Sequence, residues 1–75
     1  MNRTQQFTAI IKREEDEYVS LCPELDIASQ RNNVEEAQQS LVEALELFFE
    51  TATLTEIQSR LHSAVFITRV EVNIG

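Results

Sequence analysis

Residues 34–52 read VEEAQQSLVEALELFFETA, and this stretch decides the fold. Its apolar residues recur at intervals of three and four, which is the spacing of one stripe along an α-helix. Asn33 can cap the first turn through its side-chain oxygen, and Glu36 can answer it in a capping-box arrangement. Glu35 and Glu36 also suit the positive end of the helix dipole. The sequence therefore predicts one long helix over residues 34–52, with these residues facing a core: Val34, Ala37, Leu41, Ala44, Leu45, Phe48 and Ala52.

Upstream of this helix the apolar period changes to two, which is typical of strands. Residues 6–12 predict a first strand with Phe7, Ala9 and Ile11 on one side. Residues 18–22 predict a second strand with Val19 and Leu21 facing inward. The charged run between them lacks the Asn-Gly or Asp-Gly pair that two-residue hairpins favour, so we expect a longer loop there.

Pro23 lacks an amide hydrogen, so the second strand should stop before it. Residues 25–29 then alternate again and point Leu25 and Ile27 to the core, and polar residues follow. The three segments predict an antiparallel meander with the long helix packed on one face.

Two further elements are expected after the helix. Leu54, Ile57 and Leu61 are spaced as in a helix, which indicates a short second helix or a bent continuation of the first, and we favour a separate helix. From residue 64 to residue 74 the alternation returns and predicts a long final strand, with one face made by Phe66, Thr68, Val70, Val72 and Ile74. The predicted fold is α+β, in the order β-β-β-α-(short α)-β, and residues 1–75 form a single domain.

Charge and composition limit the function. Six basic residues against thirteen acidic ones give a net charge of −7, which repels phosphate backbones and anionic lipids. We therefore expect no direct binding to nucleic acid or membranes, and a preference for a basic protein partner. One cysteine and no apolar N-terminal stretch predict a cytoplasmic protein. A chain of 75 residues without disulfides gains stability by association, so a homo-oligomer, dimer or tetramer, is expected.

The stretch YVSLCPELDIASQ at residues 18–30, followed by VEEA at residues 34–37, resembles the N-terminal domain of HicB-type antitoxins. The shared features are a tyrosine-led strand, a Cys-Pro-Glu-Leu corner and a Glu-Ala pair that opens a helix ending in Leu-Glu-Leu-Phe-Phe. The resemblance implies a HicB-like partial RNase H fold and a partner of HicA type, a small basic ribonuclease toxin that the antitoxin occludes.

Two departures from the family pattern accompany this resemblance. Arg31-Asn32 stands where the family has a Gly-Asp turn, so Asn32 is expected to supply any left-handed conformation there. The resemblance covers the N-terminal domain only and includes no C-terminal DNA-binding domain, so autonomous repression is not expected.

The sequence contains no convincing set of catalytic residues. An RNase H-like fold invites a two-metal site, for which Glu24, Asp26 and Glu71 are candidates, but scattered acidic residues are more often solvated charges at strand edges. Cys22 and His62 have no orienting motif, so we interpret Cys22 as a small buried hydrophobe and His62 as a residue near a helix end. We expect no enzyme activity, no metal and no cofactor.

Two sets of residues are candidates for protein contacts. The acidic run can be a solvated turn or a docking site for a basic partner, with Tyr18 as an aromatic anchor; the candidates are Glu14, Glu15, Asp16, Glu17, Tyr18 and Glu24. Val42 and Phe49 on one flank of the helix, and Leu47 on the other, either fill the edge of the core or form a subunit interface.

The resulting hypothesis is an antitoxin-like protein that binds and occludes a small basic ribonuclease toxin. The alternative is a stand-alone oligomeric structural or regulatory protein of HicB-like fold with no toxin partner.

Overall fold

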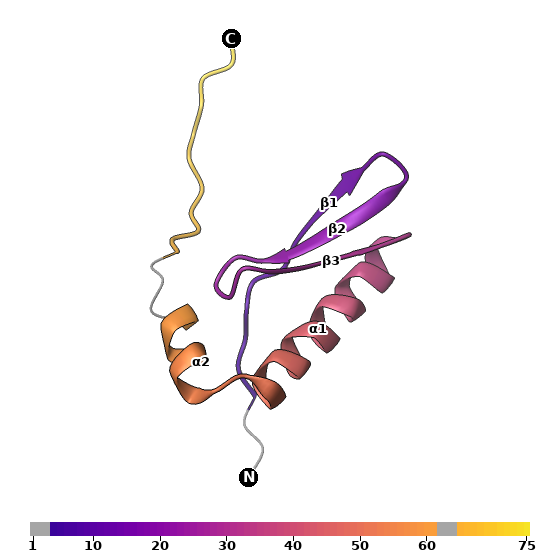
Figure 1. The fold of residues 1–75 in the computed structure, drawn as a ribbon. Helices are drawn as coiled ribbons and strands as arrows, with labels where there is room; N and C mark the ends of the chain where they lie inside the picture. The colour runs from indigo at the N-terminus through magenta and orange to yellow at the C-terminus, as the bar shows by residue number, and fades with distance from the viewer. Residues whose placement is uncertain (1–3, 62–64) are drawn as a thin grey trace.

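The computed structural model describes residues 4–61 and 65–75. It is an α+β fold in which three strands, β1 (Ile10–Glu14), β2 (Glu17–Cys22) and β3 (Ile27–Arg31), precede two helices, α1 (Val34–Thr51) and α2 (Leu54–Leu61). The strands form an antiparallel meander in the order β1-β2-β3, and α1 packs against it (Figure 1). The predicted meander, long helix and separate short helix are confirmed. No helix in the described part of the chain is long and apolar enough to cross a membrane.

The β1–β2 hairpin is tighter than its sequence indicates. Glu14 pairs with Glu17, so the loop contains only Glu15 and Asp16, and the prediction of a longer loop is wrong. Glu15 has a φ of 54°, in the left-handed region where the first loop residue of a type II′ turn also lies. Charged side chains at these positions remain in solvent, so the short loop buries no charge.

Both outer strands begin later than predicted. Thr8 donates its backbone N–H to the Glu24 carboxylate instead of to a strand carbonyl, so residues 6–9 lie outside the ladder and β1 starts at Ile10. Leu25 is buried within the β2–β3 turn, and Asp26, with a φ of 54°, reverses the chain before β3 begins at Ile27. Asn32, which was expected to supply a left-handed conformation in the turn before the helix, has no positive φ; among the described non-glycine residues, Glu15 and Asp26 have one. The prediction that the second strand ends before Pro23 is confirmed.

The face of β2 that meets the helix is the opposite of the one predicted. Ser20 and Cys22 are fully buried, and the Ser20 hydroxyl donates to the Ala37 carbonyl of α1 at 2.8 Å. Because side chains alternate along a strand, Val19 and Leu21 point to the face away from α1, where they are half-buried. Small side chains allow α1 to approach the sheet closely, and this packing outweighed the higher hydrophobicity of Val19 and Leu21.

The core lies between α1 and the sheet. Its buried centre is Cys22, Leu25 and Leu41, and these partly buried residues pack around it: Phe7, Ile27, Leu45 and Phe48. Asn33 caps α1 as predicted, since its Oδ1 accepts from the Glu36 N–H at 2.8 Å. The structure records no return bond from the Glu36 side chain to Asn33 within the described residues, so only half of the expected capping box is present. Val34 is 43% exposed and so lies outside the core.

One arginine attaches α2 to the rest of the fold. Thr53 caps this helix, because its Oγ1 accepts from the Glu56 N–H at 3.1 Å. Arg60 donates to the Leu25 carbonyl at 2.6 Å and lies over the Phe48 ring, with 5.1 Å from the guanidinium carbon to the ring centroid. It also forms an ion pair with Glu56 at 3.7 Å. The second helix is thereby tied to the β2–β3 turn and to α1.

The predicted final strand over residues 64–74 is not formed. Residue 64 lies outside the described residues, and segment 65–75 has no assigned strand and no ladder partner in the described chain. The segment runs away from α2 and stands clear of the sheet at its C-terminal end (Figure 1). The radius of gyration is 14.6 Å, against about 11 Å for a compact domain of this length. The alternating pattern is present, but a strand also requires a neighbour to receive its hydrogen bonds.

Candidate protein-binding surfaces

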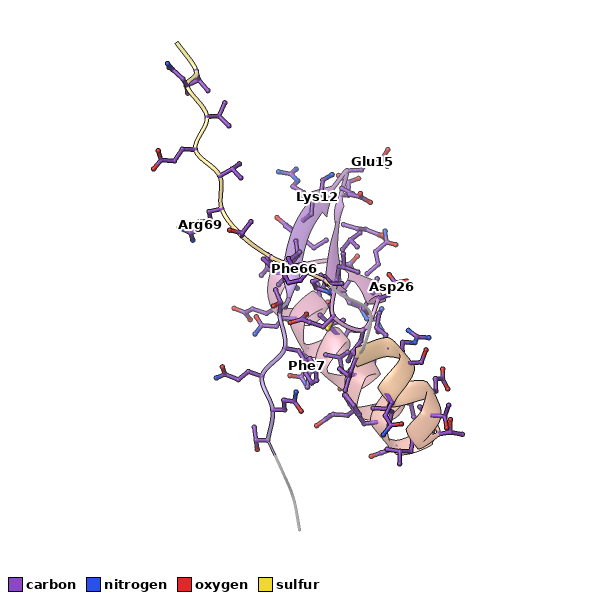
Figure 2. The ribbon with its side chains drawn as sticks, turned by 90° about the vertical axis from the view of Figure 1, so that its left-hand side faces the viewer. Phe7, Lys12, Glu15, Asp26, Phe66 and Arg69 are labelled. Carbon is purple, nitrogen blue, oxygen red and sulfur yellow. The ribbon has the colours of Figure 1, made fainter. Side chains whose placement is uncertain are left out.

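The acidic hairpin tip is the most charged part of the described surface. Glu14, Glu15, Asp16 and Glu17, together with Gln30, line a shallow depression of about 620 Å³ at one end of the sheet. No ion pair within 4.0 Å neutralises these carboxylates among the described residues, where only Arg60 and Glu56 form such a pair. Gln30 donates to the Glu17 carboxylate, and Arg13 donates to the Glu15 backbone carbonyl at 3.2 Å. Three exposed carboxylates and that of the half-buried Glu17 thus occupy four consecutive positions, with Glu15 at the extremity (Figure 2).

Tyr18 does not share a face with the acidic side chains that flank it. The register pairs Tyr18 with Arg13 on one side and Arg31 on the other, so the three lie across the sheet on the face that carries α1. Glu14 and Glu17 are paired with each other and belong to the opposite face. The tip therefore presents carboxylates on one face and an aromatic residue between two arginines on the other.

Glu24 lies at the other end of β2, in the β2–β3 turn. Its carboxylate accepts from the Thr8 hydroxyl at 2.8 Å and from the Thr8 N–H at 3.0 Å. Burial opposes ionisation, but these hydrogen bonds outweigh it and lower the pKa of Glu24 below its ordinary value of 4.5. Glu24 therefore fastens the N-terminal segment to the turn, and it is not part of the acidic tip.

The remaining chemical candidates do not converge. Asp26 is exposed in the β2–β3 turn, Glu71 lies in the C-terminal segment, and His62 lies outside the described residues. Cys22 is fully buried with its thiol 3.6 Å from Glu24 Oε1, and burial raises its pKa above the ordinary value of 9.0. No group of three or more His, Cys, Asp or Glu able to hold a metal ion occurs in the part of the chain that the structure describes.

An apolar groove runs between α1 and the segment that precedes β1. It has a volume of about 830 Å³, and its helix side is lined by Leu41, Val42, Leu45 and Phe49 together with the polar Gln38, Glu46 and Glu50. Phe7 forms the other wall, and its ring stacks on that of Phe49 with centroids 5.7 Å apart. Val42 and Phe49, two of the predicted interface residues, therefore share one surface.

Leu47, the third predicted interface residue, does not line this groove. It is 58% exposed on the other flank of α1, on the side of β3. The structure thus brings two of the three residues together and leaves Leu47 apart, although it does not show what any of them contacts outside this chain.

A serine contact between helix and sheet was not anticipated from the sequence. Ser29 of β3 and Ser40 of α1 have hydroxyl oxygens 2.5 Å apart, next to the Ser20–Ala37 contact. The available signal was the spacing of Ala37 and Ser40, two small residues three positions apart on the buried stripe. Arg60 was also missed, because its bond to Leu25 joins residues 35 positions apart.

No protein-family model, curated protein or solved structure matches this chain.

Proposed function

We propose that this chain is an antitoxin-like protein that captures and occludes a small basic ribonuclease through its acidic hairpin tip. The observation that carries the proposal is the cluster of four consecutive carboxylates, three of them exposed, without an ion-pair partner among the described residues, on a chain of net charge −7. Such a field speeds encounter with a cationic partner and disfavours encounter with RNA or DNA. The resemblance of residues 18–37 to HicB-type antitoxins, with the partial RNase H-like fold that it implies, supports the same proposal.

The tip carboxylates and Glu24 lie at opposite ends of the sheet and have different roles in this proposal. The tip carboxylates of Glu14 to Glu17 stand at the extremity, where a partner can reach them without displacing α1. Tyr18, on the α1-bearing face, would contact an apolar or acidic feature of the partner, since two arginines flank it. Glu24 serves the fold through Thr8, so its contribution to partner binding is indirect.

The test is co-expression with a short basic ribonuclease encoded next to this chain. We expect this chain to relieve the growth arrest, to co-purify with the ribonuclease and to inhibit RNA cleavage in a purified assay. Neutralising the tip (Glu14→Gln, Glu15→Gln, Asp16→Asn, Glu17→Gln) should weaken inhibition by on the order of 100-fold and flatten its salt dependence.

A matched control removes the same charge elsewhere. The control changes four other residues to Gln: Glu43, Glu46, Glu50 and Glu71. It removes as many negative charges as the tip variant but leaves the tip intact. If this control weakens inhibition as much as the tip variant, the net charge is responsible and the proposed docking site is wrong. Unimpeded RNA cleavage at saturating concentrations of this chain would reject the antitoxin proposal itself.

A second candidate is a stand-alone oligomeric protein of structural or regulatory role. The observation that favours it is the large exposed apolar surface on the C-terminal segment and in the α1 groove. This candidate differs from the antitoxin proposal in having no toxin partner, so an oligomeric chain that fails to inhibit the ribonuclease would favour it.

A further inference from the structure

The C-terminal segment, residues 65–75, exposes an unusual amount of apolar side chain. Phe66 is 88% exposed, Val70 80% and Ile74 93%. They belong to one alternating face, while Arg69, Glu71 and Asn73 belong to the other. A contiguous apolar row of this kind on a soluble chain marks a surface that another protein covers.

The length and charge of the segment suit a strand. Eleven residues of extended chain span about 36 Å, which exceeds the five residues of β1 and is enough to follow both β1 and the residues before it. Its single arginine and single glutamate cancel, so it can approach an acidic body of net charge −7 without repulsion. Arg69 lies in its middle (Figure 2).

The folded body, which comprises the sheet and the two helices, offers an edge strand beside which this segment can pair. β1 is an edge strand that pairs only with β2, so one row of its N–H and C=O groups lacks a ladder partner within the described chain. The helix α1 packs mainly against β2 and β3 and hardly touches β1. The apolar groove of Phe7, Val42, Leu45 and Phe49 lies between α1 and residues 4–9, which lead directly into the start of β1.

A strand added beside β1 would cover the exposed apolar face of segment 65–75 and supply hydrogen-bond partners for the open edge of β1. Its backbone would complete the ladder, its apolar face would enter the groove, and its polar face would extend the sheet surface that carries Lys12 and Gln30.

We propose that two copies of this chain exchange segment 65–75, each adding it as a fourth strand beside β1 of the other copy and burying Phe66, Val70, Val72 and Ile74 in the partner's groove. The occupant is a second copy because this segment leaves its own body beyond α2 (Figure 1), while the outer edge of β1 has no ladder partner in the described chain. Reciprocal exchange around a two-fold axis closes the assembly and fills both grooves. The proposal is independent of the antitoxin function, which uses the opposite end of β1.

Light scattering of the full chain at tens of micromolar tests the assembly. We expect a dimer for the natural sequence and a monomer for Val70→Asp in the segment or Val42→Asp in the groove, with dimerisation weakened by on the order of 100-fold or more because each change buries a charge. Val42 is 40% exposed, so the second variant should still fold, which circular dichroism checks.

Two controls match these variants. Leu47→Asp places the same charge on the other flank of α1, and Asn73→Asp places it on the other face of the segment; both should remain dimeric. A Val42→Asp protein that dimerises as well as the natural sequence would overturn the proposed groove.

Mixing the two monomeric variants tests exchange itself. The Val42→Asp copy keeps a native segment and the Val70→Asp copy keeps a native groove, so an equimolar mixture should form a heterodimer joined by one exchanged strand. Absence of this heterodimer, although the natural chain dimerises, would contradict exchange. A monomeric natural chain whose amides 65–75 resist hydrogen exchange would overturn the proposal, because the segment would then return to its own sheet.

Discussion

The β-meander and the C-terminal segment 65–75 are both extended chain, yet their surroundings are opposite. In the meander, β2 receives hydrogen bonds from a strand on each side, and Ser20 and Cys22 are fully buried under α1. In the segment, residues of equal or greater hydrophobicity lie in solvent, and Ile74 is 93% exposed. The comparison teaches that alternation selects an extended conformation but does not supply the neighbour that makes it a strand.

The largest expected effect comes from the core that holds the meander to α1. Leu41 is 2% exposed, and Leu41→Ala should lower the free energy of unfolding by about 2–5 kcal/mol through lost burial and a residual cavity. Urea unfolding followed by circular dichroism measures this change. Leu47→Ala on the same helix should change it by less than about 0.5 kcal/mol, and an equal loss at both positions would contradict the assigned core.

The second effect tests whether small side chains set the distance between helix and sheet. Ser20→Val adds volume and removes the hydroxyl that donates to Ala37, so we expect a loss of about 1–3 kcal/mol. The same substitution at exposed Ser59 should cost less than about 1 kcal/mol, mainly from helix propensity. A neutral Ser20→Val in thermal unfolding would mean that the contact with α1 is loose.

The third effect concerns the anchor that keeps residues 6–9 out of the ladder. Hydrogen bonds from Thr8 lower the pKa of Glu24, so its stabilising effect is present above pH 4.5 and is lost as the pH falls through the lowered value. Glu24→Gln should cost about 0.5–1 kcal/mol at neutral pH, allowing for solvent screening. The difference should shrink in urea unfolding as the pH is lowered below 4.5 through the lowered pKa; a constant difference across this range would refute the assigned ionisation.

The smallest effect on the free energy of unfolding is expected from substitutions in segment 65–75. In protein dilute enough to be monomeric, Ile74→Asp should change the free energy of unfolding by less than about 0.5 kcal/mol, because Ile74 contacts little of its own chain. At high concentration the same change should lower stability, since binding between copies stabilises the folded state. A large loss under dilute conditions would show that the segment packs on its own body.

Local patterns were sufficient for much of the fold. The apolar stripe and Asn33 predicted α1 and its start, and Pro23 predicted the end of β2, because both depend on neighbours within a few residues. The tight β1–β2 loop could not be predicted, since Glu15 adopts a positive φ that its residue type rarely takes.

The candidate sites were likewise predictable from the sequence only in part. The acidic run was visible in the sequence, but the separation of Tyr18 from Glu14 and Glu17 depends on strand register, and the grouping of Val42 with Phe7 and Phe49 depends on how the N-terminal segment crosses α1. Contacts between distant residues are decided by packing, which periodicity does not encode.

By itself the sequence determined which residues form helices or extended chain, the charge of the surface and the position of the main helix, because these follow from side-chain chemistry and short-range spacing. Tertiary structure alone decided that Ser20 and Cys22, not Val19 and Leu21, face α1, and that segment 65–75 stays outside the sheet. The physical reason is that a buried face is defined by what packs against it and a strand by what pairs with it, and in the described chain no strand pairs with the outer edge of β1.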